Sequence, residues 1–571
     1  MSAVTRETVR TEAPLDASLD LLQERKARWA QLPVIDKIRY LEEVLDLAIK
    51  RAPDWVAAGA AMKGLNPGSP LIGSEEWLAG PYPTVAWLHD VIETLEDLRT
   101  GKDPLAGVPT SRTVTGQVAA RVLPGSWYDH LLFNGFTLDV WMQPGVTQET
   151  LRGTIATFYR EEDPPGRVTL VLGAGNVSAI PILDALYALI ADGDVVVLKL
   201  NPVNVCYGPV FEAILQPLIR DGYLQLVYGG AETGEYLTHH ASVEAIHITG
   251  SERTYNQIVF GSPEGGASPV LTKPVRAELG GVGPTIVLPG PWSRDEIAYQ
   301  AENLATQKLH SSGHTCVASQ ILVLPAEWQH HDALLDELRA ALRDAPQRSN
   351  YYPGAADRLA SFAAANPGAE VIEGTDQDRL LLAGVDPASD HPAFREELFG
   401  PVYVATSLAG RDTAEYLRSA VRFANTALHG NLGANIIVHP STAKHLGSEL
   451  DQAVADLRYG CIGINAWAGV VFLASKGAWG AHPGNTPQDI QSGTGAVHNA
   501  LLFDRAEKNV LTAPFRTFPM GVRHGDPTLA VKPPWFVTNK TAEATARQLT
   551  HFAADPKPQR LVGLFASALR G

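Results

Sequence analysis

The chain has 571 residues, of which 45% are hydrophobic and 19% charged; this composition is typical of a globular protein and excludes an intrinsically disordered one. Its 46 Lys and Arg against 62 Asp and Glu give a net charge of −16, which argues against general nucleic-acid binding. The longest apolar stretch, 179–200, is interrupted by three aspartates and therefore does not predict a membrane span. The first residues lack the apolar segment of a signal peptide.

The first third of the chain predicts helices followed by a mixed region. Apolar residues at three-, four- and seven-residue spacing predict helices within 17–63, and a similar pattern predicts one over 81–98. Within the mixed region, the runs 136–142 and 153–159 have a β-like pattern.

Strands and helices then alternate, which predicts a doubly wound α/β domain with a buried parallel sheet. A second α/β domain follows, and two helices end the chain. Strands are predicted at 168–172, 195–198, 224–227, 245–248, 275–279, 320–324, 403–406, 434–438 and 462–465, with helices at 180–190, 208–220, 233–239, from about 251, 293–310, 327–343, 540–553 and 558–569.

A glycine-rich turn joins the first strand and helix of the doubly wound domain. Gly173-Ala174-Gly175-Asn176-Val177-Ser178 begins like a dinucleotide-binding fingerprint, but Ser178 replaces its third glycine. The acidic residue expected after the second strand is Lys199, so the fingerprint alone is weak. Lys199 nevertheless ends a buried parallel strand, where open α/β sheets bind their ligands.

The three cysteines fit neither a disulfide scaffold nor a zinc site, which favours a cytoplasmic location, and we expect no metal. Cys206 and Cys461 are predicted to be small buried hydrophobes. Cys316 lies in Ser311-Ser312-Gly313-His314-Thr315-Cys316-Val317, where small neighbours leave its thiol open to a substrate. It is the candidate nucleophile.

Three further motifs accompany Cys316. Glu278-Leu279-Gly280-Gly281 places a carboxylate at a strand end, and Glu397-Leu398-Phe399-Gly400-Pro401 places a second one before a turn. Thr249-Gly250-Ser251 opens a helix whose backbone N–H groups suit a phosphate. With Asn176 and Lys199 these motifs form an ordered set that resembles the aldehyde dehydrogenase superfamily, from the N-terminal helices to about residue 520.

The resemblance implies a catalytic mechanism. Cys316 would attack an aldehyde, Asn176 would donate to the resulting oxyanion, and Glu278 would activate water to hydrolyse the thioester to a carboxylic acid. Because coenzyme-A-acylating members generally lack this glutamate, Glu278 favours hydrolysis. The alternatives are an acylating dehydrogenase and a non-catalytic binding or structural protein that retains the fold.

The resemblance also implies a nicotinamide cofactor, NAD or NADP. Members that prefer NAD usually carry Glu three residues after the lysine, where this chain has Pro202, so the choice stays open. Trp467 and Trp479 either belong to the core or line an aromatic pocket for an apolar or aromatic aldehyde. The implied cofactor-binding residues are Lys199, Gly230, Gly234, Gly250, Ser251, Glu397 and Phe399.

The implied fold is aldehyde-dehydrogenase-like, with a Rossmann-like cofactor domain, an α/β catalytic domain and a small β arm that extends a partner's sheet. The enzyme would be a homodimer or homotetramer that binds neither nucleic acid nor membrane. The predicted parts are the cofactor domain at 1–134 and 164–280, the catalytic domain at 281–509, the arm at 135–163 and 510–518, and an extension of unknown role at 519–571.

Overall fold

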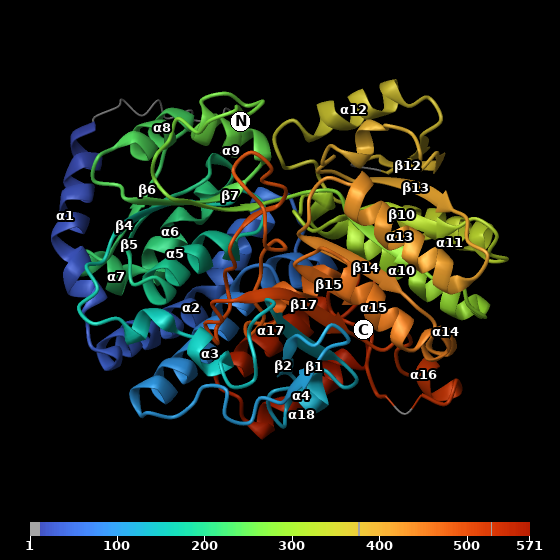
Figure 1. Ribbon diagram of the computed structural model, residues 1–571, viewed down its shortest axis with the longest axis horizontal. Helices are drawn as coiled ribbons and strands as arrows, with labels where there is room; N and C mark the ends of the chain where they lie inside the picture. The colour runs from blue at the N-terminus through green and yellow to red at the C-terminus, as the bar shows by residue number, and fades with distance from the viewer. Residues whose placement is uncertain (1–11, 375–376, 527) are drawn as a thin grey trace.

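The structure is a computed structural model that describes residues 12–374, 377–526 and 528–571 (Figure 1). The start of the chain, residues 1–11, for which no signal peptide is predicted, lies outside the described residues. Two lobes, each built on one β-sheet, make up the molecule. Within the described ranges, no helix combines the length and the apolar character needed to cross a bilayer.

The six-stranded sheet confirms the predicted doubly wound domain. Its order is β16-β8-β7-β4-β5-β6, parallel throughout except for the short antiparallel β16. The strand order reverses between β4 and β7, and such a switch point leaves a crevice at the carboxyl ends of the strands. The strands are β4 Val168–Leu172, β5 Val195–Lys199, β6 Leu224–Val227, β7 Ala245–Gly250, β8 Val275–Leu279 and β16 Gly493–Thr494.

Helices from the N-terminal half surround this sheet. α5 is buried along almost its whole length, which explains its nearly continuous apolar sequence. The single helix predicted over 208–220 is in fact two, because a new helix begins before Pro217. The helices are α1 Glu12–Ala30, α2 Val34–Met62, α3 Pro81–Arg99, α5 Ala179–Ala191, α6 Gly208–Ile214, α7 Gln216–Arg220, α8 Ala231–His239 and α9 Glu252–Phe260.

The eleven-stranded sheet confirms the second α/β domain. Its order is β1-β2-β3-β17-β15-β14-β9-β10-β13-β12-β11, with a parallel centre from β17 to β12. The strands are β1 Thr110–Arg112, β2 Val118–Leu123, β3 Thr137–Met142, β9 Gly283–Val287, β10 Ser319–Pro325, β11 Glu370–Ile372, β12 Arg379–Val385, β13 Val402–Leu408, β14 Gly433–Ile437, β15 Cys461–Ile464 and β17 Ala506–Thr512. The lobe's helices are α4 Asp129–Leu132, α10 Arg294–Leu309, α11 His331–Asp344, α12 Ala355–Ala365, α13 Thr413–Ala427, α14 Pro440–Leu446 and α15 Ser448–Asp456.

The two segments predicted as the β arm pair with each other within the chain and join the eleven-stranded sheet. β3 pairs with β17, and β17 pairs in parallel with β15 of the same lobe. The strand expected over 153–159 is wrong, because these residues form two 3₁₀ turns, Leu151–Thr154 and Thr157–Arg160.

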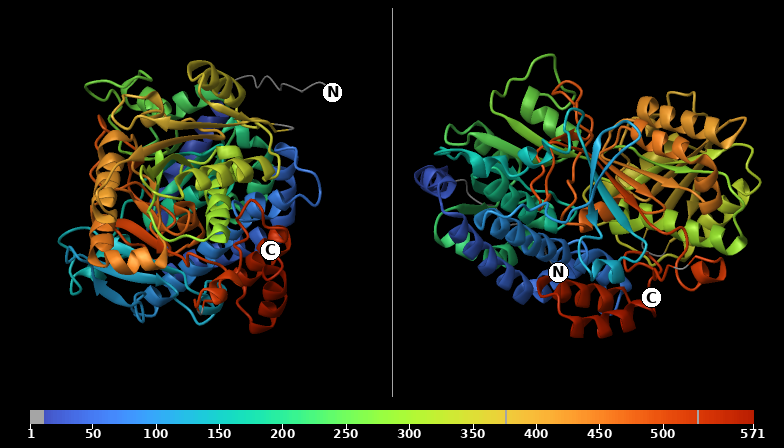
Figure 2. Two further views of the ribbon diagram at one scale, coloured as in Figure 1. Left: turned by 90° about the vertical axis from the view of Figure 1, so that its right-hand side faces the viewer. Right: turned by 60° about the horizontal axis from the view of Figure 1, so that its bottom comes forward.

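The C-terminal extension packs on the N-terminal helices. After α16 Met520–Arg523, the predicted helices are present as α17 Ala542–Ala554 and α18 Pro558–Ala568. α17 contacts α3 and the π-helical turn η1, Ile72–Trp77, and Figure 2 shows these red helices beside the blue N-terminal ones. The extension therefore joins the compact body of the protein.

Candidate active site

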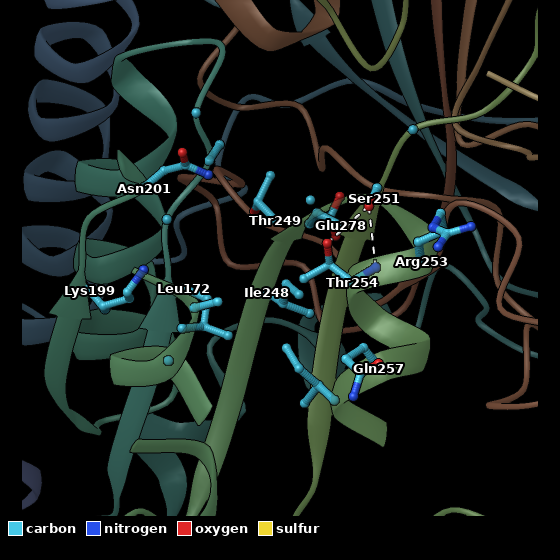
Figure 3. Close-up of a pocket in the computed structure, with 18 of the residues that line it drawn as sticks. Leu172, Lys199, Asn201, Ile248, Thr249, Ser251, Arg253, Thr254, Gln257 and Glu278 are labelled. Carbon is cyan, nitrogen blue, oxygen red and sulfur yellow. Dashed lines mark hydrogen bonds between the residues drawn. The ribbon is translucent and has the colours of Figure 1, made fainter. Parts of the chain in front are cut away.

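A cavity of about 780 Å³ opens at the carboxyl ends of β4, β5, β7 and β8, where the switch point predicts a ligand crevice. Figure 3 shows Lys199 at one side of this groove and Arg253 at the other. Leu172 and Ile248 lie between them and give the groove an apolar floor. We call this cavity the cofactor groove.

The cofactor groove gathers every catalytic and cofactor-binding residue predicted from the sequence. They come from both lobes, so no single sequence segment forms the site. The lining includes Asn176, Lys199, Gly230, Gly234, Gly250, Ser251, Glu278, Cys316, Glu397 and Phe399.

The helix that leads to Cys316 has a strongly defined start. The Ser293 hydroxyl accepts from the Glu296 backbone, and the Glu296 carboxylate accepts from the Ser293 backbone in return. This capping box satisfies two backbone donors that would otherwise be unpaired at the start of α10. α10 therefore has a defined start in the lobe of the eleven-stranded sheet, and it ends just before the loop that carries Cys316.

The nucleophile loop, residues 310–316, has an unusual backbone. Ser311, Ser312 and Gly313 all have positive φ, at 51°, 60° and 77°. For a non-glycine residue this conformation costs about 1–3 kcal/mol and persists only where the surroundings impose it. At Gly313 a Cβ would lie 2.5 Å from the Gly400 carbonyl oxygen, so the loop packs directly on the Glu397–Pro401 turn. This packing brings Cys316 and Glu397 to one groove.

Cys316 is partly buried and lies where two cavities meet, the cofactor groove and a smaller apolar cavity. Burial raises the pKa of its thiol well above the usual range, and the carboxyl groups of Glu397 and Glu278 raise it further. In this state the thiol is mostly protonated at neutral pH.

The other two cysteines differ from each other. Cys461 is fully buried at the start of β15, as predicted, and burial raises the pKa of its thiol to about 12. The prediction that Cys206 is buried is wrong: it is exposed in the 3₁₀ turn Pro202–Tyr207. Its Sγ lies 3.7 Å from Sδ of Met62 at the surface.

Glu278 is the next-to-last residue of β8 and is only 5% exposed. Among the described residues, neither of its carboxylate oxygens has a hydrogen-bond partner. Burial raises its pKa well above the usual range, Asp184 raises it further, and Arg276 opposes the rise. A buried carboxyl group without partners is costly, so this carboxyl group is unlike the paired buried carboxylates of the chain.

Asn176 is held against the nucleophile loop. Its Nδ2 donates to the His314 carbonyl oxygen at 3.0 Å, and the Tyr351 hydroxyl donates to the Asn176 carbonyl oxygen at 3.3 Å. A Cβ on Gly175 would lie 2.8 Å from the side chain of Asn201, so glycine permits this tight turn. The glycine-rich turn thus presents an amide donor beside Cys316.

Glu397 packs directly on the end of β8. A Cβ on Gly280 would lie 2.1 Å from Glu397 Oε1, so only glycine leaves room for this carboxylate. Burial raises the pKa of Glu397 to about 7, while Lys308, the Gly281 backbone and Arg358 oppose the rise.

The groove has the features of a dinucleotide site. Lys199 is 7% exposed, and burial lowers the pKa of its ammonium group. Ser251 caps α9 by accepting from the Thr254 backbone at 3.3 Å, which leaves the remaining N–H groups of that helix end for a phosphate (Figure 3). Gly230, at the start of α8, has no atom within 4 Å of a built Cβ, so open space lies beside it.

Sequence reasoning missed several groove residues. Asn201, Arg253, Arg358 and Tyr352 line the groove but belong to no motif in the ordered set. Asn201 does have a local signal, because it precedes Pro202 and its side chain caps the 3₁₀ turn that follows. Arg358 and Tyr352 lie far along the chain and have no such signal.

The smaller cavity lies on the other side of Cys316 and has a volume of about 50 Å³. Both predicted pocket residues, Trp467 and Trp479, line it while being 6% and 5% exposed. The two alternatives for these residues are therefore compatible, because each belongs to the core and also lines a cavity. The Trp467 indole N–H donates to the Val317 carbonyl oxygen at 3.0 Å, which fixes the ring beside the nucleophile loop.

Residues 141–356 match the family model described as "Aldehyde dehydrogenase family", and this range includes Asn176, Lys199, Glu278 and Cys316. Over this segment the chain is similar to the aldehyde dehydrogenase superfamily. It is 30% identical over 258 residues to the NADP/NAD-dependent aldehyde dehydrogenase PuuC of Escherichia coli, covering 40% of this chain and 46% of that one.

A second relative, an aminoaldehyde dehydrogenase of Arabidopsis thaliana, is 26% identical over 289 residues, covering 45% of this chain and 53% of its own length. The chain thus spans about half the length of these curated relatives.

Solved structures of the superfamily show the same fold. The γ-glutamyl-γ-aminobutyraldehyde dehydrogenase of Burkholderia cenocepacia has a TM-score of 0.58 at 18% identity, covering 88% of this chain and 90% of that one. An NAD-dependent aldehyde dehydrogenase of Sinorhizobium meliloti has a TM-score of 0.57 at 18% identity, covering 92% and 89%. The superfamily fold therefore covers nearly the whole chain.

Proposed function

We propose that this protein oxidises an aldehyde to a carboxylic acid with NAD or NADP as the acceptor. The observation that carries the proposal is the position of Cys316, where a dinucleotide-sized groove and an apolar cavity meet. Glu278 and Asn176 line the same groove. A nucleophile, a base and an oxyanion donor at one junction are the groups that this reaction needs.

The chain's own residues perform the covalent steps. The Cys316 thiolate adds to the aldehyde carbon, and the Asn176 amide and the Cys316 backbone N–H donate to the oxyanion of the thiohemiacetal. After oxidation to a thioester, Glu278 takes a proton from water as the water attacks the carbonyl carbon. The carbon–sulfur bond then breaks, which releases the acid and restores the Cys316 thiolate.

The residues of the cofactor groove fit a nicotinamide dinucleotide. Lys199 would bind a ribose hydroxyl, the start of α9 at Gly250 and Ser251 the pyrophosphate, and Glu397 with Phe399 the second ribose. When bound, the cofactor supplies the two-electron acceptor for oxidation of the thiohemiacetal. Pro202 at the start of its turn offers no carboxylate against a 2′-phosphate, which leaves both NAD and NADP as candidates.

Location and assembly are also proposals. Three unpaired cysteines support a reducing, cytoplasmic location. A homo-oligomer remains proposed by the resemblance to the superfamily, although the arm strands pair within their own chain.

The test is a panel of aldehydes offered with NAD and NADP, with and without coenzyme A, in which reduced cofactor and products are measured. We expect a free acid in amounts equal to the reduced cofactor, whether or not coenzyme A is present. Formation of acyl-coenzyme A would favour the acylating alternative. If tryptophan fluorescence shows that neither cofactor binds, the non-catalytic alternative would be favoured.

Asn176→Ala is expected to lower kcat about 10²–10³-fold, the usual loss for one oxyanion donor. Cofactor affinity should stay unchanged, because the variant removes only an amide beside the nucleophile loop. Asn425→Ala is the matched control, since it also removes an amide-to-carbonyl hydrogen bond, to Asp456 at 2.8 Å, but lies outside the groove lining. Equal small losses in both variants would contradict the oxyanion role.

Gly280→Ala is expected to weaken cofactor binding about tenfold, because the new Cβ occupies the position of Glu397 Oε1. Titration of NAD and NADP by tryptophan fluorescence measures this loss. Gly368→Ala serves as control, since a Cβ there meets only Leu382 at 3.9 Å. Unchanged affinity in Gly280→Ala would exclude Glu397 from cofactor binding.

A further inference from the structure

The apolar cavity beside Cys316 has one wall from a segment that the resemblance to the superfamily does not cover. Trp535, from the C-terminal extension, lines this cavity together with Trp467 and Trp479. It is 6% exposed, and its ring meets that of Phe136 edge-on at 6.2 Å. The indole is therefore a fixed part of the cavity.

The segment around Trp535 is anchored to the helix that carries the nucleophile loop. The Val537 backbone donates to the Thr306 hydroxyl at 3.1 Å, and the Thr538 hydroxyl donates to Glu302 at 2.9 Å. Lys532 forms an ion pair with the same Glu302 at 2.7 Å. Since Glu302 and Thr306 belong to α10, the extension has a defined position relative to Cys316.

The extension also contacts the segment that supplies another part of the cavity wall. At Gly73 a built Cβ would lie 2.1 Å from the backbone of Ala542, so η1 and the start of α17 are in direct backbone contact. Leu78, just after η1, lines the cavity. The Ser74 carbonyl oxygen lies 2.8 Å from His310 Nε2, and His310 also lines the cavity.

The cavity has no charged lining residue among the described parts of the chain. His310 is its one ionisable residue besides Cys316, and burial lowers the pKa of that imidazole below its usual range. Because a buried water molecule needs about 10–15 Å³ of such space, a cavity of about 50 Å³ holds a chain of a few heavy atoms. A charged tail would be left without a partner there.

We propose that the C-terminal extension forms the inner wall of the aldehyde pocket, and that Trp535 limits the substrate to small, uncharged, apolar aldehydes. This inference rests on the proposed oxidation of an aldehyde at Cys316. It also gives the extension a role, since its anchored segment sets the length of the pocket.

Trp535→Ala tests the wall directly. We expect the ratio of kcat/KM for octanal to that for propanal to rise about tenfold or more, since an added methylene alone changes discrimination by about tenfold or more. Trp127→Ala is the matched control, because Trp127 is 53% exposed and lies outside the cavity lining. Trp535→Phe is a smaller change that can be tested if the alanine variant does not fold. It should raise the octanal-to-propanal ratio above that of wild type, but by less than the alanine variant would. An unchanged ratio in both Trp535 variants would overturn the proposal.

Alkylation of Cys316 provides a measurement that needs no turnover. The protein is reacted with N-methyl or N-octyl iodoacetamide at pH 9, with saturating NAD or NADP filling the groove. Mass spectrometry follows alkylation of the peptide that contains Cys316, so that reaction at the exposed Cys206 does not interfere. Trp535→Ala should speed the octyl reagent about tenfold relative to the methyl one. If the ratio of octyl to methyl alkylation rates changes while wild type oxidises no aldehyde, the role of Trp535 in the cavity wall is supported and the proposed function is wrong. If wild type oxidises aldehydes and neither the kcat/KM ratio nor the alkylation-rate ratio changes in Trp535→Ala, only the proposed role of Trp535 is wrong.

Discussion

Cys316→Ala is expected to lower aldehyde oxidation at least about 10⁴-fold, because loss of a nucleophile removes the whole covalent route. No other described cysteine can replace it: Cys461 is fully buried, and Cys206 is exposed outside the groove. Cofactor binding should remain, since the groove is otherwise unchanged. Reduced-cofactor absorbance measures the first effect and fluorescence titration the second.

Cys206→Ser is the matched control for this variant and should keep wild-type turnover. It also removes one thiol, but from the surface turn beside Met62. Turnover that survives Cys316→Ala would show that the thioester route is wrong. Loss of both turnover and cofactor binding would instead indicate a damaged fold, which Cys316→Ser, with its nearly equal volume, would distinguish.

Many of the parallel strands could be predicted from the sequence almost to the residue, whereas β9 and β12 were not predicted. Val168–Leu172, Leu224–Val227 and Val275–Leu279 have the predicted bounds. These runs are rich in apolar and β-branched residues, and turn residues flank them. The bounds of these strands could be predicted because the segments are buried, and burial is visible in the local apolar pattern.

The pairing of distant strands could not be predicted in this way. β17 joins β15 of its own chain, although the local pattern of 137–142 and 506–512 fits a partner's sheet equally well. Edge strands pair through backbone groups, which all residues share, so sequence pattern alone does not select the partner.

The residues of the candidate site that belong to a recognisable motif could be predicted from the sequence, and the others could not. Asn176 lies in the glycine-rich turn after β4, Glu278 lies in β8 just before a glycine pair, and Cys316 lies in the loop between α10 and β10. All three line the groove. Trp535 has no motif, and its position depends on how the extension docks on α10. The exposure of Cys206 likewise follows from tertiary packing, because its apolar neighbours in the sequence suggest burial.

Glu278→Gln is expected to separate the two halves of the reaction. Formation of the thioester needs no base at Glu278, so one equivalent of reduced cofactor per active site should appear rapidly. Hydrolysis should then be about 10²–10⁴-fold slower, the usual contribution of a general base. Rapid-mixing absorbance shows the burst, and mass spectrometry detects the acyl group on Cys316. Steady turnover at the wild-type rate would contradict the role of Glu278.

The same variant has an expected effect on stability. Burial raises the pKa of Glu278 well above its usual range, so the folded state binds a proton that the unfolded chain releases above about pH 4.3. The stability from this proton is complete below the unfolded pKa and is lost as the pH rises toward the folded pKa. Glutamine carries no such charge, so Glu278→Gln should melt at a higher temperature than wild type at pH 8. The difference should shrink toward pH 5, and a difference independent of pH would contradict the raised pKa.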